Sequence, residues 1–387
     1  MAYRYRVISG DGHIEIPPEM WTPHVPKEWR DRAQRLVKLP TGGDGIVMEG
    51  RDTYVLGLAM GGKPYEQRNV VGEVFEDNPG TGGPEQRVRE QDQDGVDAEI
   101  LYHTHQTMWR GIREDAGYRA LIRAFNEFLA EDYCAYAPDR LIGMGLIPDT
   151  NMDDAIAELE YCARAGLKGI MLRSYPNGKG YPMPEDDRFW AAALDLNMGI
   201  TAHSIFGGPG SGPTSRYRQQ PGAGEVHTSG ADPVGYVTRF STSMGRSMAQ
   251  MMFTGVFERF PSLRIYFAET QAGWIPHFLF QADDNYARTR FWAERSFGVG
   301  PLPQPPSDYI RRHAVWGFLR DPVGVQLRHQ VGVDNLIWGT DFPHQQGDWP
   351  NSRAVIDESF AGVPEDERYA MLAGNAIDFF HLDAEVP

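Results

Sequence analysis

The sequence predicts an α/β protein folded as a closed (β/α)8 barrel of the TIM-barrel type, and three observations support this prediction. Short apolar runs alternate with segments of helical period along most of the chain, which is the pattern of a parallel sheet covered by helices. Eight such runs occur without an internal sequence repeat, which favours a closed barrel over an open sheet. Residues able to bind a metal ion stand at the ends of the first and last runs.

Each predicted strand is a short apolar run that ends at a proline, a glycine or a polar residue. The strands are predicted at residues 5–11, 98–103, 141–147, 169–173, 198–203, 263–269, 313–318 and 336–340. The helices are predicted at residues 85–94, 118–136, 153–165, 187–196, 241–260, 272–295 and 365–373. Pro148 and Pro343 stop the chain after the third and eighth strands, and Gly166 ends the helix at 153–165.

Two segments do not follow the alternation and are interpreted as insertions over the C-terminal face of the barrel. Residues from about 40 to 83 are rich in glycine and have no sustained helical period, with a small hairpin expected around residues 53–56. Residues 207–232 are polar and too long for a simple turn, and we predict a lid there. We interpret residues 1–387 as a single barrel domain that carries both insertions.

Composition excludes several classes of protein. The chain has 387 residues, 41% of them hydrophobic, which is enough for one large core. No apolar run approaches the roughly 20 residues that span a bilayer, and the N-terminus enters a strand without a signal-peptide pattern, so we expect no membrane association and a cytoplasmic location. The net charge of -16 makes nucleic acid an improbable partner. We expect a small-molecule substrate and, as for many barrels, a homo-oligomer.

The only two cysteines, Cys134 and Cys162, lie in predicted helices and are expected to be buried thiols rather than a disulfide or a zinc-thiolate site.

Histidines and carboxylates follow several of the predicted strands. Functional residues of (β/α)8 barrels lie at the C-terminal ends of the strands, so these side chains should converge on one mouth. The predicted metal ligands are His13, Glu15, His203, Glu269 and Asp341. Such a mixture of nitrogen and oxygen donors suits one or two divalent transition metal ions, namely zinc, iron or manganese. An ion with an open position would activate a water molecule as nucleophile.

Several of these residues have a plainer interpretation. Asp11 can simply cap a turn, and Glu15 can orient an imidazole instead of binding the metal. Glu269 can pair with Arg173, since both stand at predicted strand tips. His344, three residues after Asp341, can either shape the turn or act as an acid or base.

Candidate substrate contacts come from aromatic residues and arginines near the predicted mouth. Trp274, Trp316 and Trp349, with Trp109, suggest a largely apolar pocket for a bulky acyl or aromatic group. Arg173 or Arg110 could hold a substrate carboxylate.

Three segments together resemble a known family. Asp11-Gly-His-Ile-Glu15, the strand-end His203, and Trp338-Gly-Thr-Asp-Phe-Pro-His344 are similar to motifs of the amidohydrolase superfamily. The resemblance is to the amidohydrolase-related family, which includes the aminocarboxymuconate semialdehyde and resorcylate decarboxylases. It implies a metal-dependent barrel with metal contacts from His13, His203 and Asp341. Glu15 would take the second place of the usual His-x-His or Glu-x-His pair, in an order that departs from the pattern.

A second departure bears on the reaction. Decarboxylases of that family carry a catalytic histidine at the end of strand six, whereas this chain has Ala268-Glu269-Thr270. A glutamate there suits a second cation or a base for metal-bound water, so the sequence favours hydrolysis of an amide, ester or thioester. Asp341, Glu269 and His344 would be the catalytic residues.

Two alternatives remain open at this stage. The first is a metal-dependent non-oxidative decarboxylase of an aromatic or unsaturated acid, with His344 supplying the missing acid. The second is a binding barrel that has lost catalysis.

Overall fold

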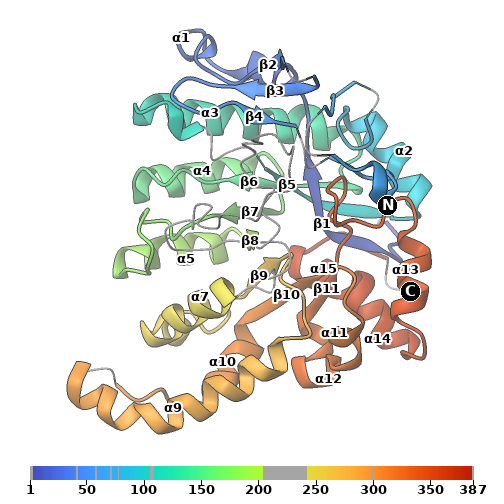
Figure 1. Ribbon diagram of the computed structural model, residues 1–387. Helices are drawn as coiled ribbons and strands as arrows, with labels where there is room; N and C mark the ends of the chain where they lie inside the picture. Colours follow the sequence, from blue (N-terminus) through green and yellow to red (C-terminus); the bar gives the residue numbers. More distant parts are fainter. Residues whose placement is uncertain are drawn as a thin grey trace, which may run out of the picture.

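The computed structural model describes residues 3–40, 42–56, 59–69, 72–76, 78–104, 109–203, 242–297 and 300–385. It contains an eight-stranded sheet in which all neighbouring strands are parallel (Figure 1). In sheet order the strands are β1 (Ile8–Ile14), β5 (Ala98–His103), β6 (Leu141–Leu146), β7 (Gly169–Leu172), β8 (Gly199–His203), β9 (Ile265–Ala268), β10 (Ala314–Phe318) and β11 (Leu336–Trp338). All eight predicted strands are confirmed.

The ring is completed between β1 and the residues that follow β11. The amide of His13 donates to the carbonyl of Phe342 at 2.7 Å, and the amide of Asp341 donates to the carbonyl of Asp11 at 2.8 Å. Gly12 and Phe342 form a parallel bridge between the same two segments. The predicted (β/α)8 barrel is therefore confirmed, with its first and last strand tips side by side.

Helices lie outside the strands, with α3, α4 and α5 stacked along one side in Figure 1. The longer helices are α2 (Pro84–Asp94), α3 (Asp115–Phe128), α4 (Met152–Arg164), α5 (Asp187–Asp195), α7 (Thr242–Phe253), α9 (Ile275–Phe297), α10 (Pro306–His313) and α13 (Ser352–Ser359). The shorter helices are α1 (Lys27–Arg30), α8 (Val256–Arg259), α11 (Pro322–Gln326), α12 (Arg328–Val331), α14 (Glu365–Tyr369) and α15 (Asn375–Phe380).

Three predicted helices differ from the observed ones. The segment predicted at 365–373 leaves α-helical geometry after Tyr369 and continues as a π turn. The segment predicted at 118–136 leaves α-helical geometry after Phe128 and continues as a π turn and a 3-10 turn. The segment predicted at 241–260 breaks between α7 and α8, where Gly255 has a φ of 73°. That left-handed conformation cannot continue a right-handed helix.

The interior of the barrel is filled by side chains that cross it. The hydroxyl of Tyr266 on β9 donates to the carbonyl of Gly10 on β1 at 3.1 Å, although β9 and β1 are not neighbours in the sheet. Tyr266 therefore points inward. A Cβ at Gly10 would lie 2.5 Å from both the Tyr266 hydroxyl and the Ile337 side chain, so only glycine fits this close approach.

The first insertion forms a three-stranded antiparallel sheet of β2 (Arg35–Lys38), β3 (Asp44–Val47) and β4 (Tyr54–Val55). The sheet begins before residue 40, where the sequence predicted the insertion to start, because β2 is the first partner of β3. The hairpin expected around residues 53–56 is instead the third strand of this sheet. The lid predicted at 207–232 lies outside the described residues.

Two predictions from composition can be compared with the structure. Cys134 and Cys162 are buried free thiols, as predicted. In the described part of the chain, every helix is too short or too polar to cross a lipid bilayer. The cytoplasmic location and the homo-oligomer stay predictions.

Candidate metal centre

Four strand tips bring histidines and carboxylates together inside the mouth of the barrel. Asp11 and His13 stand two residues apart on β1, whose pairing with β5 shifts between Ser9 and Gly12, and their side chains meet in this cluster. His203 ends β8, and Glu269 and Asp341 follow β9 and β11. All five residues except His203 are nearly or fully buried.

The distances between these side chains are short. His13 Nε2 lies 3.3 Å from Asp11 Oδ1 and 3.1 Å from Asp341 Oδ1. His203 Nε2 lies 3.0 Å from Asp11 Oδ1 and 3.7 Å from Glu269 Oε2. Asp11 is thus at the centre of the cluster, between the two imidazoles.

The described residues form three overlapping sets whose donor atoms lie within 4.8 Å of one another. The sets are Asp11, His13 and His203; His13, Asp341 and His344; and Asp11, Glu269 and Asp341.

Buried polar atoms without a hydrogen-bond partner indicate whether a cation fits this cluster. Asp11 Oδ2 and Asp341 Oδ2 are buried and have no hydrogen-bond partner among the residues that the structure describes. Buried polar atoms are nearly always satisfied, and a cation would satisfy both at once. The donor set of imidazole nitrogen and carboxylate oxygen fits zinc, iron or manganese.

Backbone geometry helps to direct two of the carboxylates. Glu269 and Asp341 have φ values of 58° and 54°, in the left-handed region that side chains other than glycine seldom adopt. Such strain is concentrated at functional sites, where the surrounding structure enforces it. Here it turns each side chain inward directly after its strand ends.

The histidines stabilise the ionised form of the two aspartates. Burial acts to raise the pKa of Asp11, but the charges and hydrogen bonds of His203 and His13 outweigh it and lower that pKa. Burial likewise opposes ionisation of Asp341, yet His344 and His13 hold its pKa well below the usual range. Both aspartates are therefore carboxylates, the form that binds a cation.

His344 is held between two carboxylates. Its Nδ1 lies 2.9 Å from Asp341 Oδ1 and its Nε2 lies 3.1 Å from Glu15 Oε1. Burial disfavours the charged imidazole, but the charge of Asp341 and the two hydrogen bonds raise the pKa of His344 to about 10. In this geometry both nitrogens donate, and the ring fixes the orientation of Asp341.

Glu15 contacts His344 and lies outside the three ligand sets of the described residues. Its place beside His13, which the sequence assigned to a metal ligand, is taken in the geometry by Asp11. The predicted ligands did not include Asp11, for which a turn cap was the alternative, whereas the structure places Asp11 in two of the three sets.

The tryptophans predicted at the mouth lie elsewhere. Trp316 is 1% exposed and stacks on Phe267, which points away from the interior because its neighbour Tyr266 points inward. Trp274 packs edge-on against Trp316 and donates to the carbonyl of Thr270 at 2.8 Å. Both belong to the packing between strands and helices, so the prediction that they bind substrate is corrected.

The remaining two tryptophans also have structural positions. Trp109 is buried, and its indole nitrogen donates to Gln34 Oε1 at 2.9 Å. Trp349 packs on Phe342, with ring centroids 5.0 Å apart, and donates to the carbonyl of Glu90 on α2. Arg173 differs from the tryptophans: it directly follows β7 and lines a cavity.

Comparisons with known proteins agree with this fold and site. A family model described as Amidohydrolase matches residues 11–382. A 2-amino-3-carboxymuconate-6-semialdehyde decarboxylase of Dictyostelium discoideum is 24% identical over 303 residues, which cover 78% of this chain and 77% of the relative. An amidohydrolase structure from Mycobacterium avium subsp. paratuberculosis matches with a TM-score of 0.71 and 18% identity, covering 98% and 100% of the two chains.

A 5-carboxyvanillate decarboxylase from Novosphingobium aromaticivorans, solved with bound manganese, matches with a TM-score of 0.65 and 16% identity, covering 99% of this chain and 100% of that one. Both this enzyme and the Dictyostelium relative are decarboxylases, and this finding contradicts the hydrolysis that the sequence predicted from Glu269. The prediction was wrong because a carboxyl group can donate a proton as well as accept one, so Glu269 does not select hydrolysis.

Proposed function

The chain belongs to the amidohydrolase family, and from this premise we propose that it is a metal-dependent, non-oxidative decarboxylase of an aromatic or unsaturated carboxylic acid. The observation that carries the proposal is the buried cluster of Asp11, His13, His203 and Asp341 at the barrel mouth. The structural likeness to a manganese-bound decarboxylase supports the same reading.

In the proposed centre, Asp11 and His13 from β1, His203 from β8 and Asp341 after β11 hold one divalent cation. When bound, this ion supplies Lewis-acid stabilisation of negative charge on the substrate. Thr104 orients the His13 ring, because its hydroxyl lies 3.3 Å from Nδ1 and leaves Nε2 directed at the two aspartates. His344 does the same for Asp341.

Decarboxylation breaks the bond between the carboxylate and its carbon, and the electron pair stays on that carbon. Carbon dioxide leaves and a proton must arrive at the same carbon. We assign this proton to Glu269, whose carboxyl lies in one set with those of Asp11 and Asp341. Three such carboxyl groups repel one another when all are ionised. Asp11 and Asp341 are assigned to the cation, which leaves Glu269 as the carboxyl group of this set for the proton transfer.

The direct test is to incubate manganese-loaded protein with a panel of aryl carboxylates and to measure carbon dioxide release and the decarboxylated product. Release from at least one member supports the proposal. Acyl thioesters and amides form the comparison panel, and their hydrolysis without carbon dioxide release from any acid would overturn it.

Addition of manganese to metal-free protein is expected to raise its thermal stability. An ion that binds only the folded state stabilises it by about 2.7 kcal/mol at a hundredfold excess over Kd. The measurement is the melting temperature with and without Mn²⁺, after removal of metal by a chelator. The His203→Ala variant serves as the control, since loss of one ligand should greatly reduce the shift. Equal shifts in both proteins would contradict the assigned ligands.

Glu269→Gln is expected to lower kcat by about 10²–10⁴-fold, the usual contribution of a positioned acid or base. Glutamine keeps the size of the side chain but cannot give up a proton. Metal content, measured by elemental analysis, should stay near that of the unmodified protein. A variant that turns over normally would exclude Glu269 as the donor, and one that has lost its metal would make it a ligand instead.

A further inference from the structure

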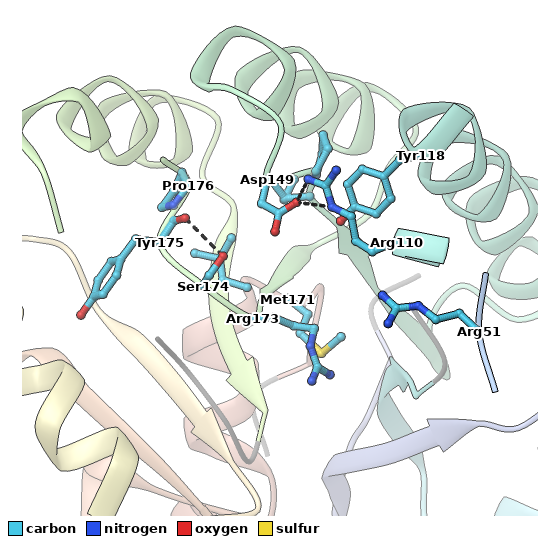
Figure 2. Close-up of a pocket in the computed structure, with 12 residues that line it drawn as sticks. Arg51, Arg110, Tyr118, Asp149, Met171, Arg173, Ser174, Tyr175 and Pro176 are labelled. Atoms are coloured by element: carbon cyan, nitrogen blue, oxygen red, sulfur yellow. Dashed lines mark hydrogen bonds and ion pairs between the residues drawn. The ribbon is translucent and has the colours of Figure 1, made fainter. Parts of the chain in front are cut away.

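A cavity at the ends of β6 and β7 is lined by three arginines. Its volume is about 340 Å³, and among the described residues its wall includes Arg51, Arg110 and Arg173 and a single carboxylate, that of Asp149. The protein as a whole carries a net charge of -16, so this cavity is locally opposite in sign to the molecule. Figure 2 shows the cavity between the ends of β6 and β7, with the side chain of Arg51 extending toward Arg173.

Arg110 and Arg173 differ in whether a carboxylate compensates their charge. Arg110 is paired with Asp149 and with Asp115, and its guanidinium lies 3.7 Å from the centre of the Tyr118 ring. Arg173 has no ion-pair or hydrogen-bond partner in the part of the chain that the structure describes. A guanidinium without a counter-ion in a concave site is a receptor for an anion, and for a carboxylate it offers a bidentate fork.

The position of Arg173 connects this cavity to the metal centre. Leu172 on β7 is in register with Ala202 on β8, so Arg173 continues the same line opposite His203. The C-terminal ends of barrel strands lie at one mouth, and neighbouring strands are about 4.8 Å apart. Arg173 and His203 therefore stand at the same mouth, at the ends of adjacent strands.

We propose that Arg173 binds a second acidic group of the substrate, so that the acid consumed here carries two anionic substituents, one at the metal centre and one in the arginine-lined cavity. This inference rests on the proposed function for the role of the first group. Arg51 faces the second group from the opposite wall, on the loop that joins β3 to β4. The antiparallel sheet of the first insertion thereby contributes to substrate selection.

The test measures binding rather than turnover. Isothermal titration of the full-length, manganese-loaded protein with benzene-1,3-dicarboxylate and with benzoate compares ligands that differ by one carboxylate. The dicarboxylate should bind the unmodified protein more tightly than benzoate. Arg173→Gln should weaken dicarboxylate binding by at least about tenfold, as expected for loss of a charge-assisted contact, and should leave benzoate binding unchanged.

Arg164→Gln is the matched control, because it makes the same charge change on the exposed outer face of α4, where Arg164 pairs with Glu160 at 3.7 Å. This variant should change neither the affinity for the dicarboxylate nor the affinity for benzoate. Equal binding of the two ligands by the unmodified protein, or equal dicarboxylate affinity in Arg173→Gln, would overturn the inference. Arginine-dependent dicarboxylate binding without carbon dioxide release from any acid would retain this subsite and reject the proposed function, so the two failures are distinguishable.

Discussion

Replacement of Asp341 by asparagine is expected to lower kcat/KM for decarboxylation by roughly three orders of magnitude, or about 4 kcal/mol of transition-state free energy. The carboxylate of Asp341 lies 3.1 Å from His13 Nε2 and 2.9 Å from His344 Nδ1, so it is both a proposed ligand and the partner that fixes two imidazoles. Asparagine preserves the shape and tolerates the positive φ at this position, but it cannot supply the charge that a divalent ion requires.

The measurement combines turnover, metal content and the melting temperature of the metal-free variant. The fold should be retained, because the change buries no additional volume. Asp366→Asn, on the exposed first turn of α14, is the matched control and should behave as the unmodified protein. Near-normal turnover with full metal content in Asp341→Asn would reject the proposed centre. His203→Ala tests the same centre from β8 and should abolish turnover as well.

The second large effect is expected on stability, from Arg87→Met. Arg87 on α2 is 1% exposed and forms a bidentate pair with Glu99 on β5, with distances of 2.6 and 3.0 Å. It also donates to the carbonyl of His13 at 2.9 Å and to that of Phe342 at 3.0 Å. One guanidinium therefore joins three strand segments behind the metal centre, at the point where the barrel closes.

Methionine in this position would leave Glu99 buried without its counter-charge and would leave the His13 and Phe342 carbonyls without this donor. Breaking a buried pair in this way costs about 3–5 kcal/mol. The free energy of unfolding in urea measures the loss. The double variant Arg87→Met/Glu99→Met should recover much of it, since no lone charge remains. Arg32→Met removes an exposed pair with Glu49 and Glu114 and should cost less than about 1 kcal/mol. A similar small cost for Arg87→Met would disprove this role.

The regular part of the barrel could be predicted because its signal is local. Each strand is a short apolar run that is buried on both faces, as in 141–146 and 314–318, and such runs are visible without knowledge of their neighbours. His203, Glu269 and Asp341 follow from the same pattern, since each stands where an apolar run ends and barrel strands present their ends to one mouth.

The errors came from contacts that no local pattern encodes. Trp316 and Trp274 look like pocket residues until the inward direction of Tyr266 places them on the outer side of the sheet. The choice between Asp11 and Glu15 as partner of His13 depends on the shift in the pairing of β1 with β5 between Ser9 and Gly12, and on the contact of Glu15 with His344. The reaction type was wrong because Glu269 was judged by residue type alone.

Sequence by itself determined the barrel, the strand ends that carry donors and the class of metal that they suit, because hydrophobic period and donor chemistry are properties of short segments. Only the tertiary structure decided that Asp11 lies between His13 and His203, that Arg87 ties the closing strands together, and that Arg173 faces a cavity without a counter-ion among the described residues. The physical reason is that charge pairing and desolvation depend on distances between residues far apart in the chain.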